Sequence, residues 1–72
     1  MPIQSDPAIQ IADLLTLLWE NQLATAAAVD ELTLWARSQG ATQVYDNVMG
    51  ALETLDRNAN AISDGIMALR GH

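Results

Sequence analysis

Residues 44–69, VYDNVMGALETLDRNANAISDGIMAL, decide the fold of this chain. Apolar side chains recur along the stretch at steps of three and four residues, and at 100° per residue they fall on one face about 100° wide. Charged side chains such as Asp46, Glu53 and Asp64 fall on the opposite side. The pattern predicts an amphipathic helix whose apolar stripe must be covered by the rest of the chain. The stripe consists of Val44, Val48, Ala51, Leu52, Leu55, Ala59, Ile62, Ile66 and Leu69.

The sequence before this stretch predicts another long helix. Ser5 or Asp6 can cap its free N–H groups, and Pro7 suits a first turn because its missing N–H has no partner there. Neither Gly nor Pro follows until Gly40, which is expected to end the helix as a C′ glycine. Thr42 is the expected cap of the following helix. The whole chain, residues 1–72, is then a single helical domain with an arm at 1–6, helices at 7–38 and 43–70, and a turn at 39–42.

The length of the first helix leaves an alternative open. A helix of this length spans about 48 Å, which is long for a globular domain. A break near Asn21, with Thr25 capping a restarted helix, would give a three-helix bundle instead. Without the break, two helices of similar length joined by a tight turn form an antiparallel hairpin.

The first helix carries more apolar surface than one neighbour can cover. Its apolar face spans roughly 200° of the helical wheel, much wider than the usual stripe. The chain has 72 residues and no Cys, and small scaffolds without disulfides commonly depend on association. We therefore expect an all-α fold in which two antiparallel hairpins form a homodimeric four-helix bundle with the first helices at its centre. The predicted dimer interface consists of Leu14, Leu17, Leu18, Trp19, Leu32 and Trp35.

The middle of this predicted bundle is small and polar. Gln22 and Thr25 interrupt the apolar face of the first helix, and Asn58 lies at the edge of the apolar stripe on the second. We expect these three to form a polar layer, joined by hydrogen bonds across the interface, that fixes the register of the bundle. Gly50 and Gly65 lie inside the second helix, and a close backbone neighbour is the expected reason for both.

A row of residues on the first helix, away from the predicted dimer interface, indicates a surface for another protein. Leu23, Ala27, Asp30 and Leu34 have the spacing of a helix face that docks against a groove. Tyr45 and Met49 flank the apolar stripe of the second helix and extend this surface. A third helix would bury the two leucines instead.

The composition excludes several classes of function. The chain lacks Cys and has a single His at its C-terminus, so we expect no nucleophile–base pair, no metal site and no cofactor. A net charge of −6 argues against direct nucleic-acid binding, which depends on cations that neutralise phosphates. No apolar run is long enough to predict a membrane span, and the start of the chain lacks the features of a signal peptide. We expect a cytoplasmic protein, and the use of Arg without Lys suggests a bacterial or phage source.

These observations predict a small non-enzymatic regulatory or inhibitory module that binds another protein through apolar helix surfaces. One alternative is an acidic decoy that mimics nucleic acid, such as an anti-defence protein of a phage or mobile element. Another is a structural subunit of a larger assembly. Salt distinguishes the first two, because binding by a decoy weakens as ionic strength rises.

Overall fold

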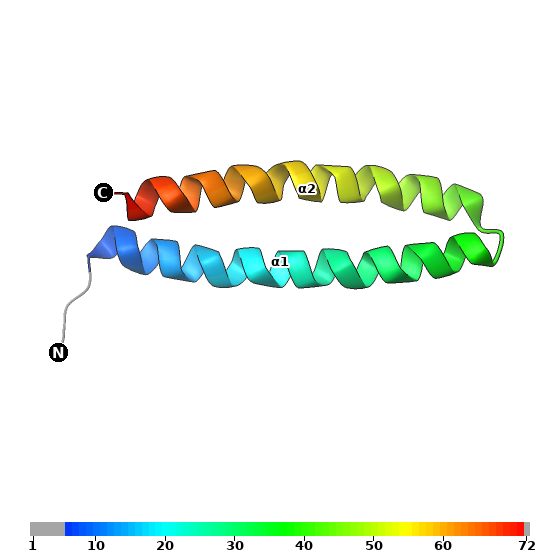
Figure 1. Cartoon of the computed structure of the whole chain (residues 1–72), viewed down its shortest axis with the longest axis horizontal. Helices are drawn as coiled ribbons and strands as arrows, with labels where there is room; N and C mark the ends of the chain where they lie inside the picture. Colours follow the sequence, from blue (N-terminus) through cyan, green and yellow to red (C-terminus); the bar gives the residue numbers. More distant parts are fainter. Residues whose placement is uncertain (1–5, 72) are drawn as a thin grey trace.

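The computed structural model describes residues 6–71, and it shows an all-α antiparallel hairpin (Figure 1). Helix α1 spans Pro7–Ser38 and helix α2 spans Thr42–Arg70. Helix α1 continues through Asn21 without a break, so the described chain forms two helices and no third one. The Cα trace is 56 Å in its longest dimension and 10 Å in its shortest, which makes the molecule one helix thick.

The start of α1 follows from its first residues. Asp6 is the N-cap, and its Oδ1 accepts a hydrogen bond of 2.8 Å from the backbone N–H of Ala8. Pro7 occupies the first helical turn, as predicted, where it leaves no donor unsatisfied. Asp6 therefore fills the predicted capping role, while Ser5 lies outside the described residues.

The turn between the helices depends on Gly40, which has a φ of +86°. Its N–H donates to the Arg37 carbonyl at 3.0 Å, and the Ala41 N–H donates to the Ala36 carbonyl at 3.0 Å. This pair of bonds is the Schellman motif, which confirms Gly40 as the predicted C′ residue. The prediction for Thr42 is wrong: Ala41 is the N-cap of α2, without a side-chain cap, and Thr42 is already helical. The hydrogen bond from the Ala41 N–H to the Ala36 carbonyl holds Ala41 against the end of α1. Only the three residues 39–41 lie between the helices.

One apolar seam joins the two helices, and we call it the inner seam. It follows an alternating spacing of three and four residues on both helices, which is the heptad pattern of coiled coils. Small side chains of α1 such as Ala12 and Ala26 face larger ones on α2, whereas the large Trp19 reaches across to the small Ala59. The inner seam comprises Ala12, Leu15, Trp19, Gln22, Ala26, Val29, Thr33 and Ala36 of α1, and Tyr45, Val48, Leu52, Leu55, Ala59, Ile62, Ile66 and Leu69 of α2.

The inner seam gives the hairpin only a small core. Among residues 6–71, only Ala12, Thr33, Leu52 and Ile66 are buried, and no large side chain is fully enclosed. Such a core is at the lower limit for a chain of this size to fold independently.

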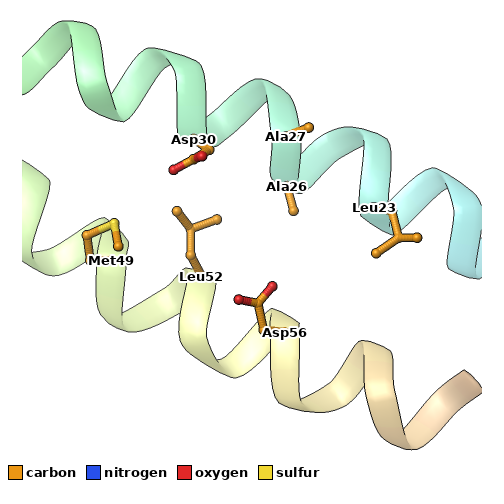
Figure 2. A pocket seen from close by; sticks show the side chains of 7 residues that line it. All are labelled: Leu23, Ala26, Ala27, Asp30, Met49, Leu52 and Asp56. Atoms are coloured by element: carbon orange, nitrogen blue, oxygen red, sulfur yellow. The ribbon is translucent and has the colours of Figure 1, made fainter.

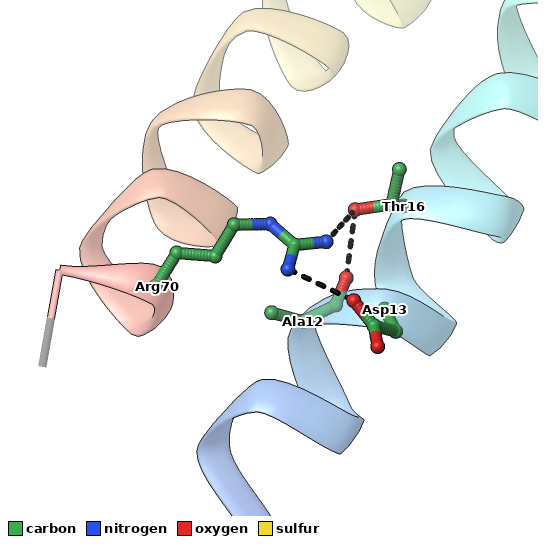
Figure 3. Close-up of polar contacts among 4 residues, drawn as sticks. All are labelled: Ala12, Asp13, Thr16 and Arg70. Atoms are coloured by element: carbon green, nitrogen blue, oxygen red, sulfur yellow. Dashed lines mark hydrogen bonds and ion pairs between the residues drawn. The ribbon is translucent and has the colours of Figure 1, made fainter.

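Polar contacts reinforce the open end of the hairpin (Figure 3). Arg70, in the last turn of α2, reaches across to α1, where its Nη1 lies 2.8 Å from the Asp13 carboxylate. Its Nη2 donates to the Thr16 hydroxyl at 3.0 Å, and that hydroxyl donates to the Ala12 carbonyl. These contacts hold the C-terminal end of α2 against the second and third turns of α1.

Candidate protein-binding surfaces

The two broad sides of the hairpin differ in chemistry, and the helical phase shows which residues lie on each side. On one side lie residues that directly follow inner-seam positions, such as Leu23, Asp30, Met49 and Asp56, which line a common pocket. In an antiparallel pair, residues that directly precede seam positions meet on the opposite side. The opposite side therefore carries Ile11, Leu18, Thr25 and Leu32 of α1 beside Val44, Ala51, Asn58 and Gly65 of α2.

The second of these sides is uncharged along the full length of both helices, and we call it the uncharged face. It comprises eight positions of α1 and eight of α2, all of them exposed and none of them Asp, Glu or Arg. Leu17 lies at its margin. The α1 positions are Ile11, Leu14, Leu18, Asn21, Thr25, Ala28, Leu32 and Trp35, and the α2 positions are Val44, Asn47, Ala51, Thr54, Asn58, Ala61, Gly65 and Ala68.

Most of the predicted dimer residues lie on or beside this face. Leu14, Leu17, Leu18, Leu32 and Trp35 are each between 54% and 67% exposed. Trp19 differs from them because it lies in the inner seam, where its indole Nε1 donates to the Ala59 carbonyl at 3.0 Å. The width of the apolar face on α1 arises from two adjacent seven-residue patterns offset by one residue. The pattern that contains Ala12 packs against α2, and the pattern that contains Leu14 stays exposed.

The predicted polar layer is divided between the seam and the uncharged face. Gln22 and Asn58 line a pocket of about 100 Å³, together with three apolar residues of α2. Thr25 lies on the uncharged face, outside that pocket. No hydrogen bond joins the three side chains within the described hairpin, so their predicted bonds across an interface remain a prediction.

The opposite side contains a pocket of about 380 Å³ between the helices, which we call the acidic groove (Figure 2). Apolar side chains from both helices line it, and the carboxylates of Asp30 and Asp56 point into the space between the helices. Neither carboxylate forms an ion pair, since Arg70–Asp13 is the only such pair in the described chain. The groove is lined by Leu23, Ala26, Ala27, Asp30, Met49, Leu52 and Asp56.

Four of the six residues predicted for a partner interface lie together in this groove, namely Leu23, Ala27, Asp30 and Met49. The other two lie outside it. Leu34 is 42% exposed further along α1, and Tyr45 lies under Arg37, whose guanidinium carbon is 5.0 Å from the ring centroid.

Sequence reasoning missed two larger lining residues. The sequence places Leu52 only on the apolar stripe of the second helix, and it gives Asp56 no predicted role. Asp56 lies seven residues after Met49, so the two lie on the same side of α2. This spacing could have placed Asp56 at the groove together with Met49.

Between residues 6 and 71, no three or more His, Cys, Asp and Glu side chains are grouped so as to hold a metal ion. Of the two helices, neither combines the length and the apolarity needed to cross a membrane.

Comparisons with protein-family models, with curated proteins and with solved structures found no match to this chain. Function is therefore inferred from the two surfaces of the hairpin.

Proposed function

We propose that this protein is a non-enzymatic, homodimeric module that binds another protein through helix surfaces. Its two sides have separate roles in this proposal. The uncharged face joins two hairpins into a four-helix bundle, and the acidic groove, which stays outside the bundle, takes a segment of a partner protein.

Self-association is supported by the amount of apolar surface that the hairpin leaves open. Six side chains of α1 (Ile11, Leu14, Leu17, Leu18, Leu32 and Trp35) are each more than half exposed. With the small residues of α2 beside them they form one exposed face along the whole hairpin, whereas a standard interface takes about 800 Å² from each partner. Exposed apolar side chains gathered on one face mark a surface that binds protein.

The distribution of charge supports the same role. Every charged residue within α1 and α2 lies off both the inner seam and the uncharged face. A second copy can therefore cover this face without removing any charge from water, which is the costliest step in burying a surface. A bundle formed in this way leaves the charged sides of both copies in solvent.

The observation that carries the partner-binding proposal is the acidic groove itself. Its floor is apolar, and two carboxylates without cationic partners stand at its edges. This combination is complementary to an amphipathic segment whose apolar side chains are flanked by Lys or Arg. Met49 adds a flexible side chain that adapts to different apolar shapes.

Two model peptides test this proposal. One is an amphipathic helix with Leu at steps of three and four residues flanked by Lys, and the other is identical except for Glu in place of Lys. We expect the Lys peptide to shift the NMR signals of the Met49 and Leu23 methyl groups, while the Glu peptide leaves them unchanged. The double variant Asp30→Asn and Asp56→Asn should bind the Lys peptide several-fold more weakly.

The contrary outcomes are distinct. Signal changes confined to the uncharged face would show that the groove is not the binding site. Equal binding of polylysine, which has no apolar side chains, with a steep loss as salt rises would favour the acidic decoy instead. Growth of the assembly beyond two chains with concentration would favour a structural subunit.

A further inference from the structure

The α1 half of the uncharged face has the same spacing in both directions about Leu23. Ile11 and Trp35 each lie twelve residues from Leu23, and Leu14 and Leu32 each lie nine residues away. The inner positions follow the same rule: Leu18 and Ala28 lie five residues away, and Asn21 and Thr25 lie two. The large side chains are therefore at the two ends of the stripe, and the small and polar ones are at its middle.

We propose that a second copy of this chain packs on the uncharged face with α1 antiparallel to α1, about a two-fold axis at the level of Leu23. This inference rests on the proposed dimer and adds its register. Each layer then pairs one residue with its counterpart across the axis. The layers are Ile11 with Trp35, Leu14 with Leu32, Leu18 with Ala28, and Asn21 with Thr25.

This register is the one that matches side chains along the whole stripe. It sets large apolar residues against each other at both ends, and it sets the small Ala28 against Leu18. Sliding the copies by one heptad leaves two large residues at one end of each stripe without a partner. It also sets Asn21 against a leucine, which leaves the amide without a hydrogen-bonding partner at a cost of about 1–3 kcal/mol.

Helix α2 has a similar spacing along the uncharged face. Its eight positions on the uncharged face are arranged symmetrically about Asp56: Thr54 and Asn58 lie two residues away, and Val44 and Ala68 lie twelve. Both centres lie in the acidic groove, where Leu23 lies toward one end and Asp56 lies nearer Ala26 (Figure 2). A two-fold axis at the level of Leu23 packs α1 on α1 and also sets α2 beside α2 of the second copy.

The two contacts in this bundle differ in size. The α1 contact holds the large apolar side chains, whereas the α2 contact holds Ala, Gly and short polar residues, so the α2 helices can approach more closely. Around the axis lies a layer of uncharged polar side chains from both copies, namely Asn21, Thr25, Thr54 and Asn58. Such a layer opposes a slipped register, because slipping removes its hydrogen-bonding partners.

Cysteine cross-linking tests the register directly, because the native chain contains no Cys. The test uses the full chain as the double variant Leu18→Cys and Ala28→Cys, together with each single variant. After oxidation or treatment with a short bis-maleimide, we expect the double variant to become a covalent dimer. Neither single variant should cross-link, because identical residues are ten positions apart along the helices in this register, or about 15 Å.

Each contrary result has its own meaning. Cross-linking of both single variants would overturn the antiparallel register, because only a parallel pair brings positions 18 and 28 each beside its own counterpart. A dimer by sedimentation that none of the variants cross-links would show that a different face or register is used. A single-chain mass for the reduced wild type at every concentration would contradict the proposed dimer itself.

Discussion

Helix α2 contains two internal glycines, Gly50 and Gly65. Both face open space in the hairpin, and only a second copy would give them different neighbours. In the hairpin, a Cβ added at Gly50 or at Gly65 would meet no atom within 4 Å, so the close neighbour predicted for each is not part of the hairpin. Gly50 points to the outer side of α2. Gly65 lies on the uncharged face, where the inferred bundle sets it beside α2 of the second copy.

The two glycines therefore form a matched pair for mutation. Gly50→Ala should raise the free energy of unfolding by about 0.4–1 kcal/mol, because Ala restricts the unfolded chain and favours the helix. Gly65→Ala should gain less, or lose stability, because its added methyl group meets the other α2. Urea titration at equal chain concentration measures both. Equal gains from the two substitutions would mean that Gly65 faces open space in the assembly.

Trp19 is the residue whose role depends most on the hairpin itself. Trp19→Phe removes the hydrogen bond to the Ala59 carbonyl and part of the ring that packs against α2, so we expect a loss of about 1–3 kcal/mol. The same exchange at Trp35 is the comparison and should cost less, because Trp35 is 63% exposed in the hairpin and the exchange removes only packing in the proposed dimer. Denaturant midpoints compare the two variants. An unchanged midpoint for Trp19→Phe would contradict the role of this tryptophan in the inner seam.

At the scale of the elements, local signals in the sequence account for most of the fold. Asp6, Pro7 and Gly40 determine where α1 begins and ends through capping and backbone geometry, which are properties of a few adjacent residues. The continuity of α1 follows from the absence of Gly and Pro between these limits. The start of α2 was harder to predict, because Ala41 is fixed by a hydrogen bond to the end of α1 and not by a cap of its own.

The division of the apolar surface on α1 could not be read from one helix alone. Its apolar face contains two overlapping seven-residue patterns, and either pattern can pair with α2. In the structure the pattern that contains Ala12 and Ala26 packs on α2, which leaves Leu14 and Leu32 exposed. The same choice assigns Trp19 to the hairpin and Trp35 to the open face.

The acidic groove was predicted only in part, for a related reason. The α1 row that contains Leu23 and Asp30 follows from helical spacing. Its alignment with Met49 and Asp56 depends on the relative stagger of the two helices, which the turn geometry determines. A three-residue turn with Gly40 in the left-handed region fixes this stagger.

At the scale of the whole molecule, folding and association are expected to be coupled. The hairpin is one helix thick and buries few side chains, whereas a bundle of two hairpins encloses the uncharged face between two layers. Stability should therefore depend on chain concentration, as it does for dimers without a stable folded monomer.

The mass in solution across a dilution series tests the central claim that two copies bury the uncharged face. Sedimentation equilibrium, with helix content followed by circular dichroism, would compare the wild type with Trp35→Asp. Leu34→Asp is the matched control, because it makes the same kind of change on α1 away from the uncharged face. We expect a two-chain mass for the wild type and for Leu34→Asp, and a single chain with reduced helix content for Trp35→Asp. A fully helical wild type that has the mass of one chain at every concentration would contradict the claim.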